Sequence, residues 1–300
     1  MQEQAEAVVG AFSLALVVGS VLLWAAILRR LFLRQPLVEL EPRQQAPWTG
    51  LDVVVLAVVM VFFEMVALSI ISSASGAVSS DAVSSTVAAG EAVISPARRL
   101  AASAARIAWV VFAVLYLIFK SGAYVEDLGL DTSRLARDAR LGGLIFVAAI
   151  VPVFAVQWFF VYALGMKSEH PIVKLSQAQP GMTILALATL MAVVVAPLFE
   201  EFAFRVILQG WLESHQARLR QGLGGDGQDK PGFAPLVITS LLFALLHFGY
   251  GPDPFALFVF SLFLGYAYRQ THRIVPSLVV HACLNGWTML NLWAMNFGGK

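Results

Sequence analysis

The sequence predicts an all-α, polytopic integral membrane protein, a helical bundle of about eight transmembrane helices. The 300 residues are 59% hydrophobic and only 13% charged, whereas soluble globular proteins are typically about 45–50% apolar and about 25% charged. Long apolar stretches recur along the chain, and a helix of about 20 residues crosses a hydrocarbon core of about 30 Å. Because lipid cannot satisfy open backbone groups, uninterrupted apolar runs must be helical.

Eight hydrophobic runs are the candidate spans. They cover residues 8–28, 51–71, 102–119, 142–164, 182–213, 234–249, 254–268 and 275–296. The sixth and seventh are short, so each is expected to be a partial or tilted span. The first is predicted to be an uncleaved anchor rather than a signal peptide, because residues 1–7 contain no Lys or Arg and Arg29 and Arg30 follow the run at once.

Basic residues divide unevenly between alternate loops. With the N-terminus outside, fourteen of the 20 Lys and Arg residues fall on the inner side and six on the outer side. Inner loops carry the excess of Lys and Arg in membrane proteins. We therefore expect both termini outside.

Composition also sets the character of the loops and excludes some functions. Residues 72–97, rich in Ser, Ala, Gly and Val, are predicted to be a flexible outer loop. Residues 214–233 contain several Gly and charged residues and are predicted to be a solvated loop. The net charge of +1 argues against a nucleic-acid partner. The single cysteine excludes an intrachain disulfide and a Cys-based zinc site.

The first pattern that could support catalysis consists of Glu200, Glu201 and Arg205 within an apolar run. A charge at mid-membrane costs on the order of 2.5–3.5 kcal/mol on insertion scales, so it must pair or face a wet cavity. Glu201 and Arg205 are four residues apart and share a helical face, in the favourable order of acid before base. Glu200 lies about 100° round the helix. We predict that Glu201 and Arg205 form a structural pair and that Glu200 is the free acid or base.

Two histidine patterns follow in later runs. Phe243 and His247 are four residues apart at the end of the sixth run, and His281 and Asn285 share a face of the last run. A histidine shuttles protons near neutral pH, and an asparagine amide can donate to a developing oxyanion. We expect Glu200, both histidines and Asn285 to converge on one cavity between the fifth, sixth and eighth runs.

Each pattern also has a structural interpretation. Membrane histidines often hydrogen-bond between helices. Glu64 is a proton-relay acid, a partner for Arg106 or Lys120, or a lipid-adapted structural residue. We favour the structural interpretation because no second motif accompanies it. Cys283, two residues from the histidine of the last run, is expected to be a packing residue that faces away from it.

The ordered set Glu-Glu-x-x-x-Arg, Phe-x-x-x-His and His-x-x-x-Asn resembles the CPBP family of intramembrane proteases. This family includes type II CAAX prenyl endopeptidases and bacterial relatives, some of them linked to bacteriocin self-immunity. The resemblance covers about residues 182–296. It implies a protease core at residues 181–300 and accessory transmembrane helices at residues 1–180. Matched by position, it implies catalytic roles for Glu200, His247, His281 and Asn285, and structural support from Glu201, Arg205 and Phe243.

The reaction that the resemblance implies is peptide hydrolysis near the membrane by a glutamate-activated water. Glu200 takes the proton from water, both histidines position and polarise that water, and Asn285 supports the tetrahedral oxyanion. No cofactor is expected, and the absence of a His-Glu-x-x-His pattern favours a metal-free site. If a zinc ion is bound, its three protein ligands would be Glu200, His247 and His281.

Two other functions remain as alternatives. A proton-coupled transporter would relay protons through buried Glu and His, but it usually shows repeat symmetry, and the sequence shows no internal repeat. A non-catalytic membrane scaffold or immunity protein would keep the polar site for packing. The expected partners are a membrane-associated peptide or protein substrate and the lipid bilayer. The expected location is a bacterial inner or plasma membrane.

Overall fold

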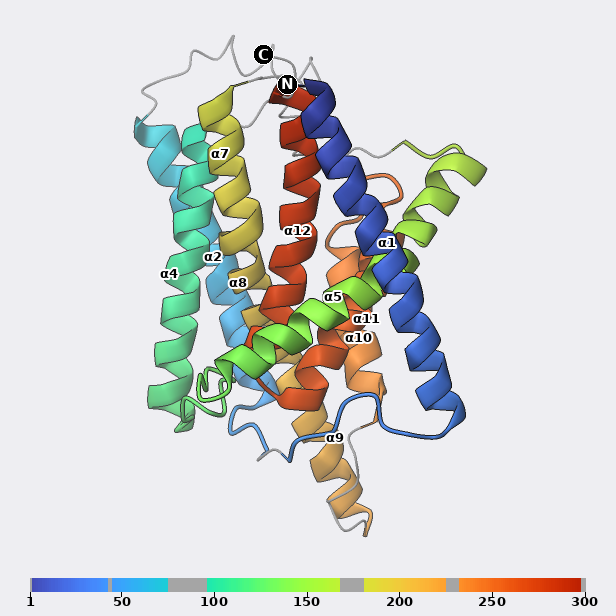
Figure 1. Ribbon diagram of the computed structural model, residues 1–300. Coiled ribbons are helices and arrows are strands. Elements are labelled where there is room, and N and C mark those ends of the chain that lie inside the picture. The colour runs from blue at the N-terminus through green and yellow to red at the C-terminus, as the bar shows by residue number, and fades with distance from the viewer. Residues whose placement is uncertain (1, 43–44, 75–95, 168–180, 225–231, 298–300) are drawn as a thin grey trace.

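The protein is a bundle of helices, shown as a computed structural model in Figure 1. The structure describes residues 2–42, 45–74, 96–167, 181–224 and 232–297, and these contain no β-strand. The predicted all-α membrane bundle is confirmed. In chain order the helices are α1 (Gln2–Phe32), α2 (Gly50–Ala74), α4 (Pro96–Ser121), α5 (Leu135–Trp158), α7 (Met182–Leu190), α8 (Ala196–Glu201), α9 (Gly210–Gly222), α10 (Ala234–Leu245), α11 (Asp253–Thr271) and α12 (Ile274–Phe297).

Five helical segments in the described part of the chain are long and apolar enough to cross a membrane. They are Ala7–Phe32, Gly50–Ile71, Arg98–Ser121, Leu135–Ala163 and Met182–Gly222. The remaining three predicted runs correspond to α10, which has only 12 residues, and to α11 and α12, whose buried faces carry polar side chains. The count of eight spans therefore stays a prediction. The start of α1 and the end of α12 lie at the same end of the bundle (Figure 1), so the two described chain ends share a side.

The fifth predicted run is one continuous helix of 41 residues, Met182–Gly222. It contains two π-helical segments, η2 (Met191–Val195) and η3 (Phe202–Gln209). Its last part, α9, projects from the bundle at what we call the α9 end (Figure 1). The loop predicted from residue 214 is thus wrong as far as Gly222. The helix continues because Ser214 is buried, where its hydroxyl donates to the carbonyl of Gly210 and accepts from the backbone of Ala46. Most of the other predicted loop, residues 75–95, lies outside the described residues.

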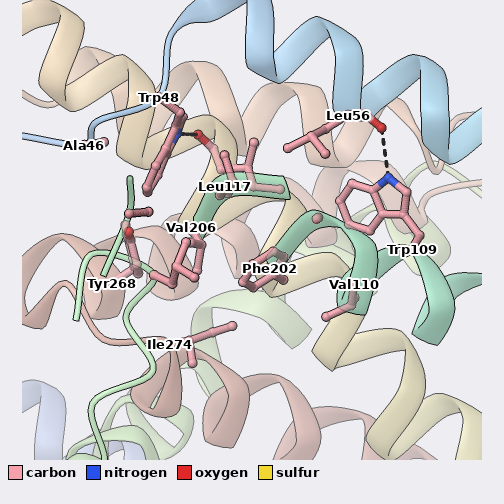
Figure 2. Close-up of a cluster of buried hydrophobic side chains, with 14 residues drawn as sticks. Ala46, Trp48, Leu56, Trp109, Val110, Leu117, Phe202, Val206, Tyr268 and Ile274 are labelled. Atoms are coloured by element: carbon pink, nitrogen blue, oxygen red, sulfur yellow. Dashed lines mark hydrogen bonds between the residues drawn. The ribbon is translucent and has the colours of Figure 1, made fainter. Parts of the chain in front are cut away.

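A hydrophobic cluster joins α2 and α4 to the helices that follow (Figure 2). Phe202 of η3 lies in this cluster and is 1% exposed. The indole N–H groups of two buried tryptophans form hydrogen bonds within this cluster. Trp48 donates to the carbonyl of Ile207 at 3.0 Å, and Trp109 donates to the carbonyl of Leu56 at 2.8 Å. The bond of Trp48 fastens η3 to the N-terminal half of the protein, and the bond of Trp109 joins α4 to α2.

Helix α5 crosses the bundle obliquely, in front of α11 and α12 in Figure 1. A second hydrophobic cluster fills the space between these three helices. Gly142 permits their close approach, because a Cβ there would lie 2.6 Å from the carbonyl oxygen of Pro276 and 2.7 Å from the Cβ of Val279. A third cluster packs α7 and η2 against α12. Helix α12 therefore has packed helices on several sides.

Two ion pairs connect α2 to α4. Asp52 at the start of α2 pairs with Lys120 and also accepts a hydrogen bond from Tyr116 at 2.9 Å. Glu64 accepts from Nε of Arg106 at 3.1 Å. Of the partners considered for Glu64, the structure thus selects Arg106, and the pair supports the structural interpretation of this glutamate.

A charged network closes the α9 end of the bundle. Arg273, in the turn before α12, donates to Asp138 of α5 at 2.8 Å and to Glu41 at 3.1 Å. Asp138 is fully buried. The hydrogen bonds from Arg273 hold the pKa of Glu41 below its ordinary value of 4.5. A lowered carboxyl pKa stabilises the fold above the ordinary value, and this contribution is lost as the pH falls through the folded-state pKa.

We predict that Arg273→Met destabilises the protein by about 3–5 kcal/mol, because it leaves the buried Asp138 without its counter-charge. Thermal unfolding in detergent measures the effect. Arg134→Met is the matched control, since Arg134 pairs with Glu41 but its side chain is 50% exposed, and an exposed pair contributes at most about 1 kcal/mol. Equal shifts for the two variants would contradict the prediction.

Candidate active site

The two adjacent glutamates lie in α8, a six-residue α-helix between the π-helical segments. The preceding Ala196 donates its N–H to the carbonyl of Met191, five residues back, which is the π-helical pattern. Pro197 has no N–H to continue that pattern. The carbonyl of Ala192, which would be its acceptor, is therefore left for a partner outside the helix.

Asn285 of α12 supplies that partner. Its Nδ2 donates to the carbonyl oxygen of Ala192 at 2.8 Å. The sequence predicted an oxyanion role for Asn285, from the chemistry of its amide and from the resemblance, and did not predict this structural bond. A proline one turn before the glutamates and an asparagine in the last run were the available signals.

Glu201 is fully buried and holds two partners. Its Oε2 accepts from Nε of Arg205 at 3.2 Å, and both side chains are 0% exposed. The spacing of four residues predicted this pair. Its Oε1 lies 2.9 Å from Nδ1 of His281. The contact with His281 was missed, because it joins residues 80 positions apart and no local spacing encodes it.

The contact with Glu201 orients the imidazole of His281. An ionised carboxylate only accepts hydrogen bonds, so Nδ1 of His281 donates and, in the neutral ring, Nε2 carries the lone pair. That Nε2 lies 3.7 Å from Oε2 of Glu200. The Glu200 side chain is 19% exposed, against 5% for His281. Glu200 thus has an imidazole as its neighbour and a side chain that is partly exposed.

His247 lies just beyond α10, which ends at Leu245 rather than at the predicted residue 249. Its Nδ1 is 2.9 Å from the carbonyl of Phe243, so this ring also donates from Nδ1 and presents its lone pair at Nε2. The Phe243 ring contacts both imidazoles, with centroid distances of 5.0 Å to His247 and 6.1 Å to His281. The guanidinium of Arg205 lies 5.6 Å from the centroid of the same ring. Phe243 therefore links the two histidines to the buried ion pair.

The same histidine tautomers bear on whether the site could bind a metal ion. An oxygen acceptor on Nδ1 orients an imidazole for metal binding, and His247 and His281 both have one. However, no group of three His, Cys, Asp or Glu side chains within the described ranges is arranged to hold an ion. The three ligands suggested for zinc are thus not assembled as a ligand set, and the cofactor requirement stays a prediction. Cys283 is half-buried in the cluster between α5, α11 and α12.

Residues 182–287 match the family model described as type II CAAX prenyl endopeptidase Rce1-like. The resemblance drawn from the three motifs is confirmed. The matched segment runs from α7 into α12 and includes every site residue named from the sequence: Glu200, Glu201, Arg205, Phe243, His247, His281 and Asn285. Comparison with curated proteins and with solved structures gave no match. The family similarity indicates an intramembrane endopeptidase and leaves the division at residue 180 as a prediction.

We predict that Glu201→Gln and Arg205→Met each lower the free energy of unfolding by about 3–5 kcal/mol, because either change leaves its partner's charge buried and unpaired. Folded yield after detergent extraction and size-exclusion chromatography measures this loss. Glu200→Gln is the matched control and should leave the yield nearly unchanged. If Glu200→Gln were the more destabilising substitution, the two glutamates would have to exchange roles.

Proposed function

We propose that the protein is an intramembrane endopeptidase in which Glu200 activates the water that attacks a peptide bond. One observation carries the proposal. The partly exposed Glu200 lies 3.7 Å from an imidazole whose other nitrogen is bonded to the buried Glu201. The similarity of residues 182–287 to type II CAAX prenyl endopeptidases supports the reaction class.

The attacking water is proposed to bind between Glu200 and His281. A separation of 3.7 Å is too long for a direct hydrogen bond and suits two groups that share one water. Glu200 takes a proton from this water while the oxygen attacks the carbonyl carbon, and the same proton then passes to the departing amine. Glu201 accepts the Nδ1 hydrogen of His281 and so holds the imidazole with Nε2 toward this water, much as the aspartate of a catalytic triad orients its histidine.

Asn285 and His247 are proposed to act on the scissile carbonyl and on the water. The Asn285 amide has two hydrogens and uses one for Ala192, so the other is available for the tetrahedral oxyanion. His247 helps to position the water through Nε2. The proposed substrate is a membrane-associated peptide or protein segment. In a bacterium without protein prenylation, a prenylated substrate is excluded and an unmodified segment is expected.

Glu200→Gln should reduce kcat by about 10²–10⁴-fold, because the amide cannot take a proton from water. Glu64→Gln is a matched control that changes another membrane glutamate outside the site and should leave kcat unchanged. The assay first captures substrate by crosslinking to the Glu200→Gln variant, identifies the bound polypeptide by mass spectrometry, and then measures its cleavage by the wild-type protein. Unchanged cleavage by Glu200→Gln would end the proposal, and altered proton flux in proteoliposomes would favour a transporter.

We further propose that activity needs no tightly bound metal. Elemental analysis of purified, active protein should find far less than one zinc per chain, and chelation should leave the cleavage rate unchanged. In the described part of the chain, no group of three His, Cys, Asp or Glu side chains is arranged as a metal-ligand set, which supports this expectation. About one zinc per chain, with activity lost on chelation and restored by zinc, would overturn it.

A further inference from the structure

A column of buried polar side chains continues from the candidate site toward the α9 end. Its members follow one another at four-residue steps from the end of α8 through η3 into α9, and each is 5% exposed or less: Glu201, Arg205, Gln209 and Glu213. Arg205 donates from Nε to Glu201 and from Nη2 to Ser261 of α11, the latter at 2.7 Å. Its third nitrogen, Nη1, is buried and has no hydrogen-bond partner in the described part of the chain.

The amide of Gln209 has a defined orientation. Its Nε2 lies 2.9 Å from a carboxylate oxygen of Glu213 and 2.9 Å from the carbonyl of Gly265. Both are acceptors, so this end of the amide must be the nitrogen. Oε1 therefore points the other way, and it too lacks a partner among the described residues.

The two unpartnered atoms face the same place on α11. A Cβ at Gly265 would lie 3.0 Å from Oε1 of Gln209 and 3.5 Å from Nη1 of Arg205. The two atoms are therefore no more than about 6.5 Å apart, and between polar atoms beyond about 3.5 Å a bridging water is to be considered. No direct hydrogen bond joins them.

Ser240 of α10 provides a third unpartnered group, one helical turn from the level of Gly265. Helices α10 and α11 run antiparallel, as the contacts of Phe233 with Arg269 and of Leu236 with the Gly265 position show. Ser240 is one turn after Leu236 on α10, and Ser261 is one turn before Gly265 on α11, so these two serines lie at the same level. Ser240 is 0% exposed, and its hydroxyl has no partner within the described ranges.

We propose that one internal water molecule binds Nη1 of Arg205, Oε1 of Gln209 and Oγ of Ser240, and that Gln209 is through this water a positioning residue of the candidate site. Buried polar atoms are almost always hydrogen-bonded, and an internal water typically makes about three bonds. The water accepts from the guanidinium and donates to the amide oxygen, while the serine hydroxyl serves as donor or acceptor.

The water holds the guanidinium of Arg205 in place, and Arg205 in turn supports the other residues of the candidate site. Arg205 holds Glu201, which holds Nδ1 of His281, and it also faces the Phe243 ring that contacts both histidines. A shift of Arg205 therefore reaches Glu200 through His281. This effect on catalysis rests on the proposed function, whereas the water site itself does not.

A structure of the full-length protein at a resolution that shows ordered water tests the site. We expect density hydrogen-bonded to Arg205 and Gln209 in the wild type. It should be absent in Gly265→Ala, whose Cβ would crowd the amide oxygen at 3.0 Å and Leu236 at 3.1 Å. A dry wild-type site, or a water bonded to neither atom, would overturn the proposal whatever the protein's activity.

Kinetics test the positioning role. Ser240→Ala and Gln209→Leu should each lower kcat about tenfold with KM unchanged, because they disturb the support of the reacting groups and not substrate binding. Thr239→Val is the matched control. Thr239 is equally buried on the same helix, but its hydroxyl bonds only the carbonyls of Pro235 and Leu236. Equal losses in Ser240→Ala and Thr239→Val, or a change confined to KM, would refute the role. If Gln209→Leu fails to fold, Ser240→Ala decides the test.

Discussion

The buried carboxylate of Glu201 is the constraint on which the candidate site depends. A charge inside an apolar bundle is stable only when it is paired and hydrogen-bonded. Glu201 meets this requirement with Arg205 on its own helix and His281 on α12. Because Arg205 also bonds Ser261 of α11, one negative charge fixes three helices relative to each other. The preceding residue, Glu200, thereby lies 3.7 Å from Nε2 of an oriented imidazole.

Local helical geometry accounts for most of what the sequence predicted correctly. The pairing of Glu201 with Arg205 depends only on a four-residue spacing and on the high cost of an unpaired charge in lipid. The helical class followed from long apolar runs, which leave no other way to satisfy the backbone. The three motifs indicated a family because their order along the chain carries information that no single pattern has, and the match of residues 182–287 agrees.

Long-range contacts account for most of what the sequence did not predict. The bond from His281 to Glu201 and the bond from Asn285 to Ala192 join α12 to residues 80 and 93 positions earlier in the chain. The end of the fifth run was placed too early because polar residues after Ser214 were taken for a loop, whereas contacts with Ala46 keep that segment helical. The runs predicted at 254–268 and 275–296 form α11 and α12, which bury polar side chains inside the bundle and are not among the five helices that are long and apolar enough to cross a membrane.

The two π-helical segments shift the rotation of residues about the axis of the Met182–Gly222 helix, so the same residue spacing points to different faces on either side of them. Each π turn holds an extra residue, and one residue corresponds to a rotation of about 100°. A helical wheel drawn over the whole segment therefore assigns wrong faces on one side of η2 or η3. Deleting one residue from η2 would restore the regular hydrogen-bond ladder and turn Glu200 and Glu201 away from α12. Insertions and deletions, rather than substitutions, are thus the sequence changes that would redirect these carboxylates.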